Sequence, residues 1–120
     1  MHGGFGRGDT LNFTAAIGPD FRAGFVDPAP VSNADIGRTM MHLLHLEVPT
    51  NGRLMGRVFA EAMPGGEMPR FANHVRVSKS AGGLRTMLRF QTVGRMRYVD
   101  AAGFPGRTVG LIVQQNRSGR

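Results

Sequence analysis

Glycine and proline interrupt this sequence so often that only short helices and strands can form between them. The 120 residues include eighteen glycines and seven prolines, with no tryptophan and a single tyrosine. Glycine supplies the positive φ angles of turns and proline cannot donate to a hydrogen-bond ladder, so both residues mark turns. The length suits one domain and is too short for two ordinary ones. A hydrophobic share of 41% indicates a folded chain with a small core.

The cysteine count and the charge exclude several classes of function. With no cysteine, the chain has no disulfide, no thiolate zinc site and no thiol nucleophile. No stretch approaches the roughly 18 apolar residues of a membrane span, and the N-terminus lacks the apolar core of a secretory signal. The net charge of +7 suits an anionic partner. No run of five like charges occurs, which favours charges dispersed over a solvated surface.

The first half of the sequence predicts one buried strand and one helix. Residues 2–9 are a glycine-rich loop, and Leu11–Gly18 combine apolar and small residues, which suits a strand buried on both faces of a parallel sheet. Ser32 or Asn33 can cap a helix that we expect from about Ala34 to Leu44. The apolar stripe of this helix consists of Ile36, Met40, Leu43 and Leu44.

The second half predicts a β-hairpin. Leu84–Gln91 alternates apolar with polar residues and pairs with Arg95–Val99 through a three-residue turn, Thr92-Val93-Gly94, in which Gly94 is left-handed. This register pairs residues across the strands as follows: Phe90 with Met96, Leu88 with Tyr98, and Arg89 with Arg97. Thr108–Val113 is a candidate last strand, and we expect residues 114–120 to be a disordered tail.

Four histidines are candidate metal ligands: His2, His42, His45 and His74. His42 and His45 lie three residues apart on the predicted helix, but zinc needs three or four converging ligands and no carboxylate pair lies nearby. His2 precedes Gly3-Gly4, where the unhindered backbone lets a ligand approach closely. A terminal His-Gly is otherwise a flexible end, and these residues alone do not assemble a reaction.

Four stretches of the sequence, taken together, resemble one enzyme family. They are His2-Gly3-Gly4, Asn12–Gly24, Pro30–Thr39 with Leu43-Leu44 behind it, and Asn51–Val58. Their order and spacing are similar to the C-terminal part of the type I phosphodiesterase/nucleotide pyrophosphatase branch of the alkaline phosphatase superfamily. The match covers roughly residues 2 to 60, half of the chain.

The resemblance implies a fold, a cofactor and one metal ligand. The fold would be the C-terminal part of an alkaline-phosphatase-like α/β/α sandwich over residues 1–113, with the hairpin in its second half. The activity of the parent enzyme would be zinc-dependent hydrolysis of small phosphoester substrates, in which two zinc ions clamp an in-line displacement. His2 matches the late histidine ligand of the family. A periplasmic or extracellular location is compatible with the family.

Two features depart from the family pattern. His45 stands where relatives often carry a glycine at the helix end. Because a left-handed residue other than glycine costs about 1 kcal/mol, we expect this helix to end differently. The family's nucleophile, Asp ligands and Asp-His pair all lie upstream of the His-Gly motif with which this chain starts. We therefore expect a fragment of such a hydrolase, inactive alone, with Met1 an internal methionine.

Two other functions stay open. The hairpin, with Tyr98 as a stacking residue, would suit a small basic nucleic-acid-binding module through four arginines: Arg85, Arg89, Arg95 and Arg97. We regard nucleic acid as the less favoured partner, because arginine on an exposed strand face is ordinarily solvated. In the third interpretation the chain is a structural piece without chemistry. Its Leu11–Ile17 segment then becomes an exposed edge that is prone to aggregate.

Overall fold

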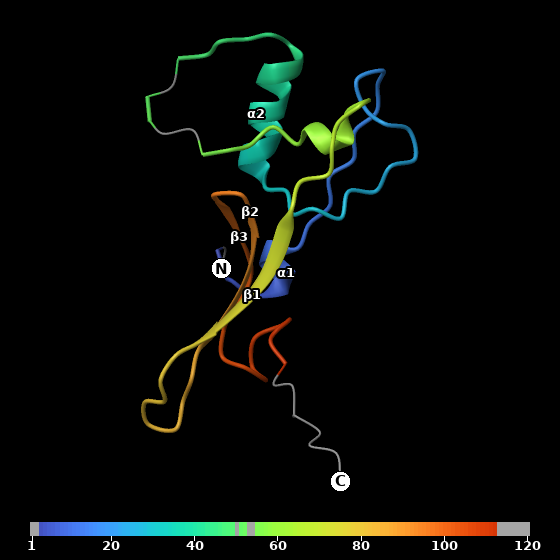
Figure 1. Cartoon of the computed structure of the whole chain (residues 1–120). Coiled ribbons are helices and arrows are strands. Elements are labelled where there is room, and N and C mark those ends of the chain that lie inside the picture. Colours follow the sequence, from blue (N-terminus) through green and yellow to red (C-terminus); the bar gives the residue numbers. More distant parts are fainter. Residues whose placement is uncertain (1–2, 50, 53–54, 113–120) are drawn as a thin grey trace. The chain divides into compact units, whose positions relative to one another are not determined.

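The computed structural model describes residues 3–49, 51–52 and 55–112. The elements in chain order are α1 (Arg7–Thr10), α2 (Asn33–Leu43), a 3-10 helix η1 (Ala60–Ala62), β1 (Phe71–Val77), β2 (Met87–Val93) and β3 (Met96–Gly103) (Figure 1). The fold class is α/β, with one three-stranded antiparallel sheet. In the described part of the chain, no helix has the length and apolar character needed to cross a bilayer.

The chain divides into two compact units. The first consists of the described residues up to Phe13, of Asn73–Gln91 and of the described residues from Val99 onward, and the second consists of Thr14–Ala72 and Thr92–Tyr98. All three strands therefore contain residues of both units. Each unit has a small set of buried apolar side chains: Phe90, Ala101 and Leu111 in the first, and Ala29, Phe59, Val93 and Tyr98 in the second.

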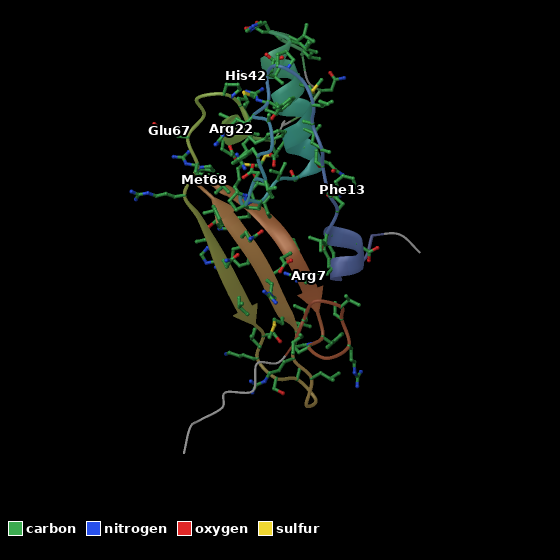
Figure 2. The ribbon with its side chains drawn as sticks, turned by 90° about the vertical axis from the view of Figure 1, so that its right-hand side faces the viewer. Arg7, Phe13, Arg22, His42, Glu67 and Met68 are labelled. Carbon is green, nitrogen blue, oxygen red and sulfur yellow. The ribbon has the colours of Figure 1, made fainter. Side chains whose placement is uncertain are left out.

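The strand predicted for Leu11–Gly18 does not form, so this prediction is wrong. These residues are irregular and every one of them is exposed. Phe13 is 88% exposed and Ile17 is 100% exposed. Figure 2 shows Phe13 on the irregular segment that follows α1. A strand buried on both faces of a parallel sheet needs neighbouring strands, and the three strands of the observed sheet pair with one another instead.

Helix α2 begins and ends within a residue of the predicted bounds, and Ser32 is its N-cap. Its apolar stripe is only partly covered, with Ile36 and Leu43 half-buried. The residues that α2 buries are Asp35 and Thr39, whereas Met40 and Leu44 of the apolar stripe are 47% and 57% exposed. The two buried residues are polar, and both accept backbone hydrogen bonds from the segment that precedes η1.

The C-terminus of α2 is a Schellman motif with histidine in the position that glycine usually takes. The His45 N–H donates to the carbonyl of His42 at 3.2 Å, and the Leu46 N–H donates to the carbonyl of Met41 at 2.9 Å. Among the described residues other than glycine, His45 alone has a positive φ, of 51°. The expectation that this helix would avoid a left-handed residue other than glycine at its end is wrong.

Replacing His45 with glycine should stabilise the chain by about 1 kcal/mol, because glycine enters the left-handed region without the Cβ clash that histidine meets. The midpoint of urea unfolding, followed by the fluorescence of Tyr98, measures the gain. His45→Ala is the matched control, since alanine keeps the clash and should gain nothing. Equal gains for alanine and glycine would show that the imidazole, and not the backbone angle, carries the cost.

Strands β2 and β3 form the predicted hairpin with a shorter turn. Two residues, Gly94 and Arg95, join the strands, and Gly94 is left-handed as predicted, with a φ of 54°. Glycine at the first position of a two-residue turn matches the twist of the flanking strands. The predicted register is therefore wrong. Arg89 reaches Asp100 at 3.4 Å, so opposite charges replace the like-charge pair with Arg97.

After β3 the chain forms turns instead of the predicted last strand. Residues 105–110 are turns and bends, closed by a hydrogen bond from the Gly106 N–H to the Leu111 carbonyl at 2.9 Å. Leu111 is buried in the first unit. Val113 and the predicted tail, residues 114–120, lie outside the described residues.

Candidate functional site

The predicted zinc ligand His2 lies outside the described residues. In the part of the chain that the structure describes, no group of three or more His, Asp or Glu side chains could hold a metal ion. His42 and His45 line one shallow hollow beside α2, and His74 stacks on Phe90 with the ring centroids 4.9 Å apart. The described residues by themselves therefore do not fit a zinc site.

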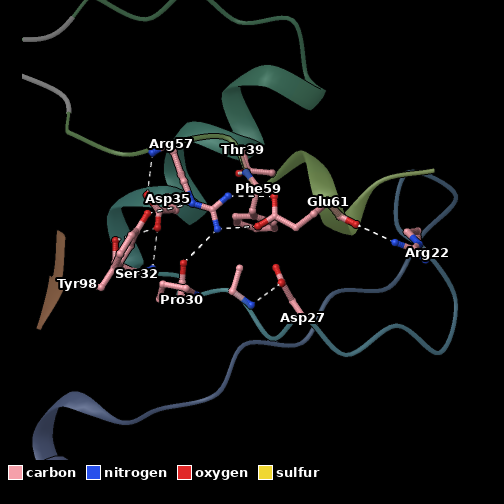
Figure 3. A network of polar contacts seen from close by, with 11 residues as sticks. Arg22, Asp27, Pro30, Ser32, Asp35, Thr39, Arg57, Phe59, Glu61 and Tyr98 are labelled. Atoms are coloured by element: carbon pink, nitrogen blue, oxygen red, sulfur yellow. Dashed lines mark hydrogen bonds and ion pairs between the residues drawn. The ribbon is translucent and has the colours of Figure 1, made fainter. Parts of the chain in front are cut away.

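The polar side chains of the second unit gather instead around the guanidinium of Arg57 (Figure 3). Its Nε donates to the Tyr98 hydroxyl at 3.0 Å, and Nη1 and Nη2 donate to the Glu61 carboxylate at 2.9 and 2.6 Å. Nη2 also donates to the carbonyl of Pro30 at 3.1 Å. The Glu61 side chain is 2% exposed. We name the set of Arg57, Glu61, Tyr98, the Pro30 carbonyl and Asp35 the Arg57 clasp.

Within the Arg57 clasp, Asp35 connects Arg57 to the start of α2. Its Oδ2 accepts from the Ser32 N–H at 2.8 Å and from the Ser32 hydroxyl at 3.2 Å, which is the return half of a capping box. Its Oδ1 accepts from the Arg57 N–H at 2.7 Å. Because Asp35 is fully buried and both oxygens are hydrogen-bonded, it joins the helix to the segment around Arg57.

The backbone around residues 56–59 runs very close to α2. The Phe59 N–H donates to the Thr39 hydroxyl at 3.2 Å. At Gly56, a Cβ atom would lie 2.7 Å from the carbonyl carbon of Ala34 and closer still to its oxygen. Only glycine fits this approach, and it allows the Arg57 N–H to reach Asp35.

Asp27 belongs to the same polar network. Its Oδ1 accepts from the Ala29 N–H at 2.9 Å, whereas its Oδ2 is buried without a hydrogen-bond partner among the described residues. Burial raises the pKa of the Asp27 carboxyl, and the charge of Glu61 raises it further, against the opposing effect of the Ala29 hydrogen bond. The guanidinium of Arg57 is engaged by Glu61, so the charge of Asp27 is poorly compensated.

Replacing Asp27 with asparagine should raise the stability at pH 7 and flatten its dependence on pH. The folded-state pKa lies above the unfolded value of 3.8, so the wild type loses stability as the pH rises from the unfolded pKa through the folded pKa. Asparagine keeps an acceptor for the Ala29 N–H and carries no charge. We expect a gain below about 1 kcal/mol, because the group is only partly buried.

Urea midpoints of the wild type and Asp27→Asn between about pH 4 and pH 8 check this prediction. The two curves should separate as the pH increases, with the variant the more stable at the upper end. Parallel curves over this range would contradict the raised pKa.

Tyr98 is not available as a stacking residue. Its ring is buried and its hydroxyl accepts from Arg57. Burial raises the pKa of Tyr98 to about 12, and the charge of Asp35 adds to the increase. A nucleobase needs an exposed aromatic face. The nucleic-acid-binding interpretation proposed Tyr98 as its stacking residue, so it is weakened. One of its four arginines, Arg89, also pairs with Asp100.

The Arg57 clasp can stabilise the second unit, but its arrangement does not favour catalysis. Each guanidinium nitrogen has an acceptor within the chain, so an incoming anion would have to displace the buried Glu61. Sequence reasoning missed this pair, although Arg57 and Glu61 are spaced i,i+4. That spacing predicts a contact within a helix, but Arg57 lies outside the described helices, ahead of η1, so the spacing alone did not reveal the pair.

No protein-family model, curated protein or solved structure matches this chain. The resemblance to the alkaline phosphatase superfamily therefore rests on the quoted residues. Three of them, Asp35, Thr39 and Arg57, lie in the Arg57 clasp or directly beside it.

Proposed function

We propose that this chain is the C-terminal part of a zinc-dependent phosphoester hydrolase with an alkaline-phosphatase-like α/β/α sandwich, and that it is inactive alone. The observation that carries the proposal is the exposed apolar segment Leu11–Ile17. In the family pattern this segment matches a strand buried within the sheet. A strand of this composition needs neighbours, which in this proposal come from other residues of the parent enzyme. The exposed Met40 of α2 and Leu44 directly after this helix would be covered in the same way.

The Arg57 clasp supports the proposal as a local framework. It joins α2 to the segment around Arg57 through Asp35, and both regions belong to the stretches that resemble the family. A framework of buried hydrogen bonds can hold these stretches together without a metal ion. In the parent enzyme, His2 would supply one imidazole to zinc, and the zinc ions would activate the nucleophile and polarise the phosphoryl oxygen.

The reading frame upstream of the Met1 codon tests the proposal. We expect in-frame codons there for a Thr or Ser nucleophile, for the Asp ligands and for the Asp-His pair. A product that includes these residues should hydrolyse bis(p-nitrophenyl) phosphate and lose this activity on chelation of zinc. The 120-residue chain should give no hydrolysis above the buffer rate. A stop codon directly upstream, with no related sequence beyond it, would contradict the proposal.

A further inference from the structure

Strand β1 is the open edge of the sheet. The strand order is β1-β2-β3, so β1 and β3 are the outer strands. The outer side of β3 is bonded, because the Ala102 N–H donates to the Phe5 carbonyl at 2.7 Å and the Thr10 hydroxyl donates to the Asp100 carbonyl. Among the residues that the structure describes, β1 has a strand partner, β2, on one side only, and all seven of its residues are exposed. An outer strand of this kind can accept a further strand.

The register of β1 and β2 determines which backbone groups face outward. The Ser78 N–H donates to the Thr86 carbonyl at 2.9 Å, and β1 ends and β2 begins next to this pair. In an antiparallel pair, every second residue turns both of its backbone groups toward the partner strand. Every second residue counted back from Ser78 therefore faces β2. The residues between them, Asn73, Val75 and Val77, turn their backbone N–H and carbonyl groups away from β2.

A shallow, mostly apolar hollow adjoins the C-terminal end of β1. Its volume is about 490 Å³, and the residues that line it include Phe5, Arg76, Val77, Leu88 and Ala102. All of these residues belong to the first unit. The side chains of an added strand would alternate between the two faces of the sheet. One apolar side chain of such a strand could therefore occupy this hollow.

The stretch of sequence that contains β1 and β2 carries charge of one sign. Between Met68 and Val99 the sequence contains six arginines and one lysine, and no aspartate or glutamate. Arg76, Lys79 and Arg85 are exposed in the first unit, and none of them forms an ion pair with another described residue. Two copies of the chain that paired along β1 would bring these like charges together, whereas an acidic strand would neutralise them.

We propose that the outward groups of Asn73, Val75 and Val77 bind an acidic, extended peptide segment as a fourth strand. The backbone of the segment would supply the hydrogen bonds, an apolar side chain would enter the hollow, and carboxylates would lie beside Arg76 and Lys79. The inference does not depend on the proposed hydrolase function, because none of the residues that carry it belongs to the stretches that resemble the family.

Fluorescence anisotropy with a labelled peptide that alternates glutamate with valine tests the proposal on the full chain. We expect saturable binding that weakens severalfold when the salt concentration rises from about 50 to about 300 mM. The matched peptide with lysine in place of glutamate should not bind. Val75→Pro removes one outward N–H without removing a ladder hydrogen bond, and it should weaken binding at least about tenfold. Val75→Thr keeps the N–H and should bind like the wild type.

Equal binding by Val75→Pro and the wild type would overturn the assignment of the edge. Tighter binding of a single-stranded oligonucleotide than of the acidic peptide would overturn the choice of occupant. Dimerisation of the chain that Val75→Pro abolishes would do the same. If circular dichroism shows that Val75→Pro loses its fold, a peptide with N-methylated alternate amides replaces it. This peptide should bind the wild type at least about tenfold more weakly, and unchanged affinity would overturn the proposal.

Discussion

Replacing Arg57 with methionine should destabilise the second unit by about 3–5 kcal/mol. The substitution leaves the Glu61 carboxylate, which is 2% exposed, as a buried charge without its partner. It also removes the hydrogen bonds that the Tyr98 hydroxyl and the Pro30 carbonyl accept from Arg57. The cost of the unpaired charge exceeds the net contribution of the lost hydrogen bonds. Urea unfolding followed by the fluorescence of Tyr98, in a chain without tryptophan, measures the loss.

Two further variants separate the unpaired charge from a general loss of packing. The double variant Arg57→Met with Glu61→Met should recover most of the stability, because apolar residues of similar volume often replace a buried ion pair at little cost. Arg38→Met removes an exposed arginine of α2 and should change the stability by less than about 0.5 kcal/mol. A loss in Arg57→Met no larger than in Arg38→Met would contradict the Arg57 clasp.

Two glycines of the second unit should respond to alanine in opposite directions. Gly56→Ala should cost about 3 kcal/mol, because its Cβ would overlap the backbone of Ala34 and force α2 away from the Arg57 segment. Gly37 lies inside α2, where a Cβ would meet nothing within 4 Å. Gly37→Ala should therefore stabilise the chain by about 0.5–1 kcal/mol through helix propensity.

The same urea midpoints measure both alanine variants, and Gly37→Ala serves as the matched control for adding one methyl group. A neutral Gly56→Ala variant would show that the Arg57 segment and α2 are not in backbone contact. The close approach described at Gly56 would then be wrong.

The parts of the fold that local rules determine were predictable from the sequence. Ser32 and the Asp35 that follows three residues later mark the start of α2, because both act within one helical turn. Gly94 was predicted to be left-handed and is so, since a tight hairpin turn needs a positive φ. Each of these features depends on neighbours in sequence alone.

The parts that depend on distant residues were not predictable. The turn between β2 and β3 starts two residues later than predicted and is one residue shorter, so the register changes and Arg89 pairs with Asp100. The burial of Asp35 depends on Arg57, which lies 22 residues further along the chain. Leu11–Gly18 has the composition of a buried strand, but the described chain offers it no partner strands. The composition of a segment indicates that it can form a strand, but a strand forms only where partner strands are available.

The zinc content of two purified products tests the central claim most directly. A product that includes the residues encoded upstream should retain about two zinc ions per molecule after dialysis, and His2→Ala in that product should lower the content to about one. The 120-residue chain should retain none. If this chain alone holds stoichiometric zinc through His2, with ligands drawn only from its own residues, the proposal that it is one part of a larger metal-dependent hydrolase is contradicted.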